Sequence, residues 1–308
     1  MYDDESISLL FSRLAANTFT IFGSEFEPVG IGVYMIASMV NHSCIPNCVQ
    51  SFIDDKLYIK TTKDICIGEE IVISYIDIAQ PTRCRRQQLK ATYGFSCSCL
   101  SCSIDIEQNY WLCKLTANCK GYLQIDGNIK YYNWQMNNLS VTGDGDAEAV
   151  LIAIEKLQLP EFPSSQTNFN CSACGSITSG IELARRTNEI YSCVSSGNLF
   201  GGYKLSCQYT SEISYIRFQI LSKLCVEMIK NSDFEAVIPF SHTLCEVAAF
   251  LYPCNHPQVA LIFLQHAKLL WFRSGDSVEF RKHYMRAARI IEVTHSRGHP
   301  IYRQLEFQ

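Results

Sequence analysis

Charged residues are scarce in this sequence, and neither sign dominates. Asp, Glu, Lys and Arg make up 18% of the 308 residues, against about 25% in average soluble proteins. The formal net charge of −4 argues against broad electrostatic binding to nucleic acid or to an anionic membrane. Hydrophobic residues reach 47%, which excludes a chain kept disordered by low hydrophobicity and high charge.

Long apolar runs are also lacking. No segment approaches the ~18 uncharged apolar residues of a transmembrane helix, so we expect no membrane association. The N-terminus, Met1-Tyr2-Asp3-Asp4-Glu5, is acidic where a signal peptide is basic, so we expect no secretory route. Cysteine, by contrast, occurs 16 times. Without secretion, metal ligation explains so many cysteines better than a disulfide framework does.

The N-terminal part is expected to be rich in short strands. Residues 6–22 pass from helical spacing into a β-branched and aromatic run. Two strand-like runs, 49–53 and 57–61, flank Asp54-Asp55, which predicts a hairpin. A further strand is predicted at 71–76.

The remainder changes from cysteine-rich to helical. A basic helix is predicted over 81–93, with Pro81 at its start. Surface loops are predicted at 126–146 and 160–172, with a short helix near 147–158 between them. Amphipathic helices joined by short turns follow and resemble a helical-repeat array; they cover 211–230, 233–251, 256–273 and 276–294.

Three motifs follow one another between residues 41 and 102. The first is Asn-His-Ser-Cys-Ile-Pro-Asn at 41–47, and the second is Gly-Glu-Glu at 68–70, which leads into a strand ending at Tyr75. The third is the CxCxxC pattern within 97–102. In this order they resemble a SET domain with its post-SET zinc loop. The RRxxLxxxYxFxCxC stretch and the helical C-terminus resemble the SET-and-MYND-domain (SMYD) lysine methyltransferases in particular.

The third motif indicates zinc independently. Cys97, Cys99 and Cys102 lie within six residues, whereas thiolate zinc requires four ligands in a tetrahedron at ~2.3 Å. A fourth ligand must therefore come from elsewhere. The resemblance implies Cys44, with an ordinary buried thiol as the alternative, whereas Cys48 is expected to pack as a small apolar residue.

The resemblance implies transfer of a methyl group from S-adenosylmethionine to a lysine amine. Tyr75 matches the catalytic tyrosine of the family, with an ordinary strand aromatic as the alternative. Asn41 and His42 match the cofactor-contacting pair, and Ser38 and Val40 fall on neighbouring contact positions. A structural core histidine is the alternative for His42.

Three aromatic residues match walls of the cofactor and lysine sites. Tyr93 and Phe95 match aromatics that line the lysine channel and cover the adenine, and Phe19 resembles another channel wall. Core packing is the alternative for all three. Asn47 is expected to tie the turn together. Glu69-Glu70 is interpreted as a fold element, because adjacent carboxylates on a strand point to opposite faces.

Further cysteines predict a second zinc site. Four of them form two knuckle-like pairs, namely Cys113, Cys119, Cys171 and Cys174. Cys193 and Cys207 are alternative ligands. The basic run 83–86 is interpreted as a solvated helix face, with contact to an acidic substrate or nucleic acid as the alternative.

Together these features predict an α+β fold in four parts. They are the C-terminal part of a SET domain at 1–78, a post-SET zinc region at 79–106, an insertion with the second zinc knuckle at 107–205, and a TPR-like helical domain at 206–308. Family members carry a glycine-containing cofactor segment, a MYND zinc module and a helical insert ahead of this region. The sequence has no MYND-type cysteine series, so we expect a truncated form.

The resemblance also implies partners and location. A lysine-bearing protein, histone or otherwise, would be the substrate, and the helical wall would grip a peptide or a chaperone tail. Family members occupy cytoplasm and nucleus, and no direct binding to nucleic acid is expected. The competing hypothesis is a non-catalytic, zinc-stabilised protein-binding adaptor of the same fold. An inactive zinc scaffold is the third hypothesis.

Overall fold

The computed structural model describes residues 3–22, 28–103, 111–114, 119–125 and 168–306. The predicted loop at 126–146 and the predicted helix at 147–158 lie outside the described residues. The chain divides into two compact units. The first contains the described residues up to Ser103 and from Tyr252 onward, and the second contains those between them.

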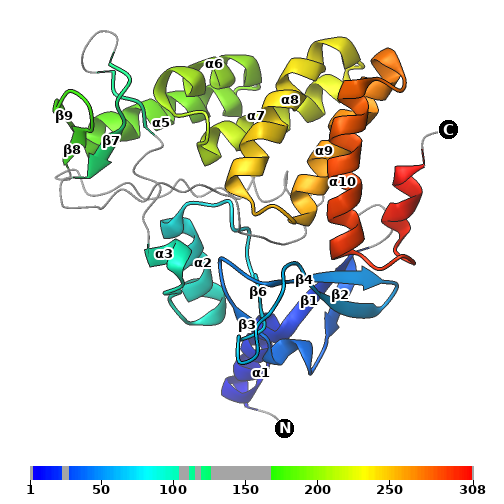
Figure 1. Cartoon of the computed structure of the whole chain (residues 1–308). Helices are drawn as coiled ribbons and strands as arrows, with labels where there is room; N and C mark the ends of the chain where they lie inside the picture. The colour runs from blue at the N-terminus through cyan, green and yellow to red at the C-terminus, as the bar shows by residue number, and fades with distance from the viewer. Residues whose placement is uncertain (1–2, 23–27, 104–110, 115–118, 126–167, 307–308) are drawn as a thin grey trace. The chain divides into compact units, whose positions relative to one another are not determined.

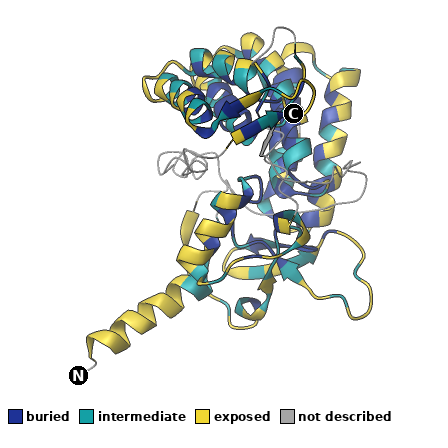
Figure 2. Cartoon of the chain, turned by 90° about the vertical axis from the view of Figure 1, so that its left-hand side faces the viewer, coloured by how far each residue is buried: buried dark blue, intermediate teal, exposed yellow. Residues whose placement is uncertain are grey.

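The first unit begins with a helix and a hairpin. Helix α1 (Asp4–Asn17) starts where the Asp3 carboxylate accepts a hydrogen bond from the Ser6 amide at 2.7 Å. It buries no side chain, and Figure 2 shows it exposed along most of its length. Strand β1 (Thr18–Phe22) pairs antiparallel with β2 (Pro28–Val33). The predicted passage from helix to strand within 6–22 is therefore confirmed.

Two further strand pairs position the motif residues. The short strand β3 (Asn41–His42) follows the 3-10 turn η1 (Ala37–Met39) and runs parallel to β6 (Val72–Ile73). Strand β4 (Cys48–Ile53) pairs antiparallel with β5 (Lys56–Thr61). Asp54 adopts a φ of 54° in the connecting turn, a conformation that Asp tolerates better than most residues. The predicted hairpin is confirmed.

The basic helix is also where the sequence predicts it. Helix α2 (Thr82–Tyr93) begins after Pro81 and ends at Gly94, whose φ of 78° suits a residue without a side chain. A single turn of helix, α3 (Leu100–Ser103), follows the cysteine motif.

The last two α-helices belong to the first unit. Helices α9 (Pro257–Ser274) and α10 (Val278–Thr294) lie side by side (Figure 1), and η3 (Pro300–Leu305) contacts α10. Helix α10 also packs on the β4–β5 hairpin. The Asn255 amide donates a hydrogen bond to the Thr62 carbonyl at 2.8 Å. The predicted helical domain at 206–308 is thus divided between the two units.

In its described residues, the second unit joins a small sheet to four helices. Strands β7 (Leu123–Ile125), β8 (Asn168–Cys171) and β9 (Ile177–Ser179) form an antiparallel sheet, so β8 occupies the end of a predicted loop. Its core includes Trp111, Phe169 and Leu183. Four helices follow in sequence order: α5 (Gly180–Ser195), α6 (Leu199–Tyr209), α7 (Tyr215–Lys230) and α8 (Phe234–Leu251). The first two were not predicted individually.

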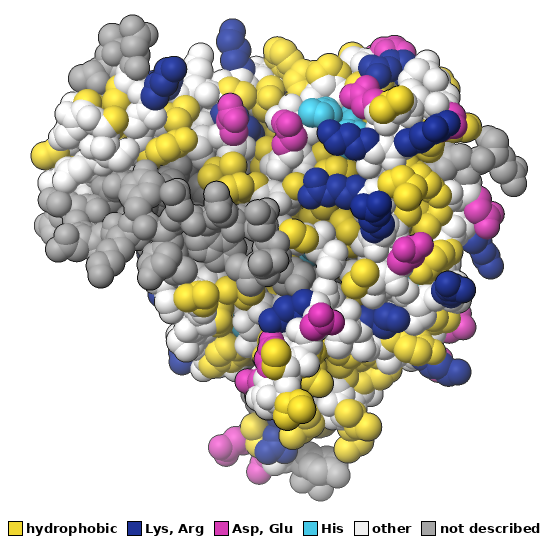
Figure 3. Space-filling view, in the orientation of Figure 1, with side chains coloured by type: hydrophobic (Ala, Val, Ile, Leu, Met, Phe, Trp, Pro, Cys, Tyr) yellow, Lys and Arg dark blue, Asp and Glu magenta, His cyan; other side chains and the backbone are white. Residues whose placement is uncertain are grey.

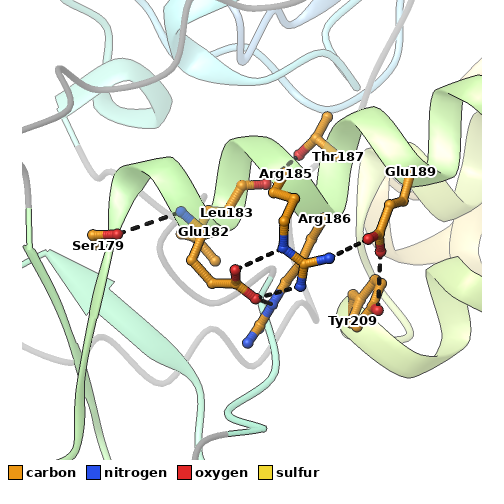
Figure 4. Close-up of polar contacts among 8 residues, drawn as sticks. All are labelled: Ser179, Glu182, Leu183, Arg185, Arg186, Thr187, Glu189 and Tyr209. Atoms are coloured by element: carbon orange, nitrogen blue, oxygen red, sulfur yellow. Dashed lines mark hydrogen bonds and ion pairs between the residues drawn. The ribbon is translucent and has the colours of Figure 1, made fainter.

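Helix α5 carries a series of ion pairs one turn apart (Figure 4). Ser179 caps its N-terminus by accepting a hydrogen bond from the Glu182 amide. The Glu182 carboxylate binds both Arg185 at 2.8 Å and the buried Arg186 at 3.0 Å. Arg185 also pairs with Glu189. These contacts at i,i+3 and i,i+4 support the helix locally.

Helix α8 bears on the expectation that no segment spans a membrane. Within the described residues it is the one helix long and apolar enough to cross a membrane by length and composition alone. The sequence did not predict a membrane span here, because the segment contains the charged residues Glu235 and Glu246. Its Val237, Leu244 and Ala248 are buried, and it packs against α7. Core helices of soluble proteins pass the same test, so the finding is weak evidence for a membrane span.

Candidate active site and cysteine clusters

Asn47 ties the first motif to the strand that follows the second. Its side chain is 2% exposed. The amide nitrogen donates to the Glu70 carbonyl at 2.8 Å, and the amide oxygen accepts from the Val72 amide at 2.9 Å. Its backbone carbonyl accepts from the Thr62 amide at 3.0 Å. The predicted structural role of Asn47 is confirmed, and these bonds place β3 beside β6.

The two adjacent glutamates bind different partners. Glu69 accepts hydrogen bonds from Lys63 at 2.6 Å and from Asn47 at 3.1 Å, and these lower its pKa to about 2. Glu70 accepts from the amide of Asn41 at 2.6 Å. Neither arrangement is that of a general acid–base pair, so the interpretation as fold elements is confirmed.

His42 and Val40 hold Tyr75 at both ends. The parallel pairing of β3 with β6 sets His42 opposite Ile73, two residues before Tyr75. The His42 Nδ1 atom accepts a hydrogen bond from the Tyr75 amide at 3.0 Å. The Tyr75 hydroxyl donates to the Val40 carbonyl at 2.5 Å. Burial raises the pKa of Tyr75, so its phenol stays protonated near neutral pH.

Four of the predicted site residues form an aromatic cluster. The ring of Tyr75 lies 5.2 Å from His42, 4.9 Å from Tyr93 and 6.5 Å from Phe95, measured between centroids. His42 and Phe95 are 6.0 Å apart. The Tyr93 hydroxyl donates to the Tyr75 carbonyl at 3.4 Å. Residues from three separate stretches of sequence thus pack around one half-buried tyrosine ring.

Two other predicted residues lie in different surroundings. Phe19 packs edge-on against Tyr34 at 5.8 Å, and Tyr34 in turn lies 5.9 Å from Phe52. The Ser38 hydroxyl lies 2.9 Å from the Tyr34 carbonyl and 3.1 Å from the Asn17 carbonyl. Sequence reasoning missed Tyr34, which its place in the apolar run before Asn41 could have indicated.

The structure brings Cys44 to the three cysteines of the CxCxxC motif. The four Sγ atoms lie within 4.8 Å of one another, and those of Cys44 and Cys102 are 3.5 Å apart. A tetrahedron of bonds of ~2.3 Å separates its sulfurs by about 3.8 Å. Hydrogen bonds from Cys102 and Cys44 lower the pKa of Cys99 far below its usual range. Both the separation and the donor set fit Zn²⁺.

Comparisons with known proteins agree with this geometry. Residues 13–76 match the family model described as SET domain. The chain is 33% identical over 304 residues to N-lysine methyltransferase SMYD2 of Bos taurus, a match covering 99% of this chain and 60% of the relative. It is 26% identical over 314 residues to Histone-lysine N-methyltransferase ASHR1 of Arabidopsis thaliana, covering 98% and 60%.

A shorter match has a higher identity. Histone-lysine N-methyltransferase SMYD3 of Homo sapiens is 40% identical over 92 residues, which cover 30% of this chain and 22% of that protein. The chain carries a SET domain of the SMYD type. This SMYD-type chain spans 60% of the length of SMYD2 and of ASHR1, to which it is similar over almost its whole extent.

The basic run in the SMYD-type chain is solvated at Arg83 and Arg86, as expected, but not at Arg85. Arg85 is 6% exposed rather than solvated, and its guanidinium donates to Thr82 Oγ1 at 2.9 Å and to Ser101 Oγ at 3.1 Å. It also lies 3.8 Å from the Cys102 sulfur. Arg85 precedes the fully buried Leu89 by four residues and so shares its helix face. That spacing is the signal the sequence interpretation missed.

Arg86 completes the attachment of the cysteine loop to α2. Its Nε atom donates to the Cys97 carbonyl at 3.2 Å, and its Nη2 atom donates to the Cys102 carbonyl at 2.8 Å. A Zn²⁺ ion held by four thiolates carries a net charge of about −2. The buried Arg85 guanidinium therefore lies where it would offset part of that charge.

The second predicted cysteine set also comes together, within the second unit. The Sγ atoms of Cys113 and Cys174 are 3.7 Å apart, those of Cys119 and Cys171 are 3.5 Å apart, and all four lie within 4.8 Å of one another. A side chain on Gly121 would place its Cβ 2.5 Å from the Cys171 sulfur. The surrounding chain therefore fits closely around the four sulfurs. The alternative ligands Cys193 and Cys207 do not belong to this cluster.

Proposed function

We propose that this SMYD-type chain takes part in S-adenosylmethionine-dependent methylation of a lysine side chain in a protein substrate. The observation that carries the proposal is the Tyr75 hydroxyl, held by the Val40 carbonyl within an aromatic cluster of a SET domain. The relatives SMYD2 and ASHR1 are named as lysine methyltransferases. Histone and non-histone proteins are both candidate substrates.

The residues around Tyr75 suit the cofactor chemically. S-adenosylmethionine supplies a methyl group on a positively charged sulfur. The Val40 carbonyl, the Tyr75 hydroxyl and the faces of Tyr93 and Phe95 offer negative potential beside one another. Asn41 and His42 would contribute through their backbone and surfaces, because both nitrogens of the His42 ring bind other groups of the protein.

The lysine must be neutral to act as a nucleophile. Entry into a half-buried aromatic site lowers the pKa of an amine, because burial penalises its charged form. The Tyr75 phenol, whose own pKa is raised, remains protonated and is unsuited to act as a base. Its hydrogen is directed to the Val40 carbonyl, which leaves the oxygen to accept a hydrogen bond from the amine. Tyr75 would thus orient the amine, and orientation supplies much of the rate in a displacement.

We propose that both cysteine clusters hold Zn²⁺ as structural ions. Each offers four thiols at separations that suit a tetrahedron. Four protein ligands leave no coordination position for a substrate, so the ions would fasten loops rather than act in the reaction.

We further propose that the protein resides in cytoplasm and nucleus and that its C-terminal helices bind a peptide, as the resemblance implies.

The test is transfer of a radiolabelled methyl group from S-adenosylmethionine to protein substrates by the zinc-loaded full chain. Tyr75→Phe should reduce transfer by at least tenfold, whereas the matched control Tyr58→Phe, in the β4–β5 hairpin, should leave it unchanged. Transfer unaffected by Tyr75→Phe would contradict the assigned role.

A non-catalytic adaptor is the second candidate, and exposed apolar residues favour it. Met35, Ile36 and Met39 are 82%, 89% and 81% exposed, beside the exposed strand β2. Figure 3 shows exposed hydrophobic side chains among charged ones of both signs. Protein binding that survives Tyr75→Phe, without methyl transfer by the wild-type chain, would select the adaptor.

A further inference from the structure

His42 lies between the first cysteine cluster and Tyr75. Its Nδ1 atom is 3.0 Å from the Tyr75 amide nitrogen, and its Nε2 atom is 3.3 Å from the Cys44 sulfur. One imidazole ring therefore contacts a residue of the candidate metal site and the backbone of the candidate catalytic residue. A role in contacting the cofactor does not require this arrangement.

The two contacts define the tautomer of the ring. An amide N–H can only donate, so Nδ1 accepts the hydrogen bond from Tyr75 and carries no hydrogen. In the neutral ring the hydrogen then resides on Nε2, which donates it to the Cys44 sulfur. The ring thus accepts a hydrogen bond from Tyr75 at Nδ1 and donates one to Cys44 from Nε2.

The state of Cys44 determines the strength of the second contact. A cysteine that binds a metal does so as a thiolate, and a charged acceptor binds an N–H group more strongly than a neutral thiol does. Metal binding at Cys44 would therefore fix the His42 ring more firmly. The ring in turn sets the position of the Tyr75 backbone.

The same short segment also holds the other end of Tyr75. The Val40 carbonyl accepts the Tyr75 hydroxyl, and Val40 is two residues before His42 and four before Cys44. The segment 40–44 therefore contacts Tyr75 at its amide and at its hydroxyl and supplies a metal ligand. Movement of Cys44 would therefore shift both contacts, because only a few residues separate Cys44 from Val40 and His42.

We propose that His42 is a positioning residue that couples metal binding at Cys44 to the placement of Tyr75. The metal site would then do more than fasten the loop, because its occupancy would set the geometry of the candidate reaction centre. This inference rests on the proposed Zn²⁺ at the first cluster and not on methyl transfer. The two are measured separately.

The experiment exchanges Zn²⁺ for Cd²⁺ in the isotope-labelled full chain and follows amide resonances by NMR. Cd²⁺ has the same charge and also prefers thiolate ligands, but it forms longer bonds to sulfur. In the wild type, the Tyr75 amide resonance should shift more than that of Tyr58. In His42→Phe it should lose this response, whereas the control His242→Phe should keep it.

A direct measurement on the wild type does not depend on the folding of any variant. With ¹¹³Cd bound, the metal should show a scalar coupling to the Nε2 proton of His42, transmitted through the Cys44 sulfur. His42→Gln, which retains a donor and an acceptor, should restore part of the Tyr75 response. The proposal would be overturned if the Tyr75 amide resonance of the wild type did not shift on exchange of Zn²⁺ for Cd²⁺, or if it shifted equally in His42→Phe. Absence of bound metal would overturn it together with the zinc assignment.

Discussion

The hydroxyl of Tyr252 donates a hydrogen bond to the Asp77 carboxylate at 2.8 Å, across 175 positions of the sequence. Asp77 lies two residues after Tyr75, and Tyr252 lies shortly before α9. Together with the bond from Asn255 to Thr62, this contact attaches the start of the C-terminal helices to the SET strands. The helices of the first unit thus share a structural unit with the candidate active site.

Replacing Tyr252 by Phe should loosen that attachment. The change removes one hydrogen bond to a carboxylate and should destabilise the first unit by about 2 kcal/mol. Hydrogen exchange of the amides in β4, β5 and α10 would measure the loss. The exposed Tyr58 offers the control Tyr58→Phe. Equal effects of the two variants would show that the Tyr252 contact adds no stability.

Arg85 should strengthen metal binding at the first cysteine cluster. Arg85→Gln removes a buried positive charge 3.8 Å from the Cys102 sulfur and should weaken zinc affinity roughly tenfold or more. Competition with a chromophoric chelator would measure the change. Arg83→Gln makes the same charge change at an exposed position of the same helix and should have little effect. Identical affinities in the two variants would contradict the role.

The two cysteine clusters should load metal independently, because they lie in separate units. The wild-type chain should bind two Zn²⁺ ions, and Cys99→Ser or Cys171→Ser should each reduce the count to one. Cys193→Ser is the control and should retain two ions. Elemental analysis of the purified variants provides the measurement, and an unchanged zinc content in Cys99→Ser would remove the first site.

Gly121 provides a test of the second site that leaves all cysteines in place. A methyl group there would lie 2.5 Å from the Cys171 sulfur and 2.7 Å from the Ala173 side chain. Gly121→Ala should therefore lose the second Zn²⁺ while the first remains. Retention of two ions would show that the second unit adjusts around the methyl group.

Two buried histidines should make the first unit sensitive to acid. Burial, together with the nearby His299 and Lys60, lowers the pKa of His295 to about 3, and burial lowers that of His299 to about 4. In the unfolded chain both titrate near 6.5. The folded state therefore binds fewer protons, and stability falls as the pH drops below about 6.5.

The expected loss is roughly 2 kcal/mol for each histidine between pH 7 and pH 5. Denaturant unfolding at a series of pH values, followed by probes in the first unit, would measure it. His295→Gln should flatten the dependence, whereas His242→Gln in the second unit should leave it unchanged. Equal slopes in the wild type and His295→Gln would contradict the assignment.

Much of the local structure was predictable because its causes are local. The alternation and turn residues around Asp54 predicted the hairpin, and Pro81 predicted the start of α2. The four C-terminal helices begin and end within a few residues of their predicted bounds. Helices α5 and α6 were not predicted individually, because residues 107–205 were interpreted as a zinc-bearing insertion.

The sequence by itself determined the motifs, the turns and the ligand types, because each depends on residues a few positions apart. Only the tertiary structure decided that Arg85 is buried, that the nitrogens of His42 contact Tyr75 and Cys44, and that α9 and α10 pack with the SET strands. These contacts join residues that are far apart in the sequence, so they depend on the tertiary fold. Cys44 and Cys102, 58 positions apart, become neighbours because intervening strands and α2 fold between them.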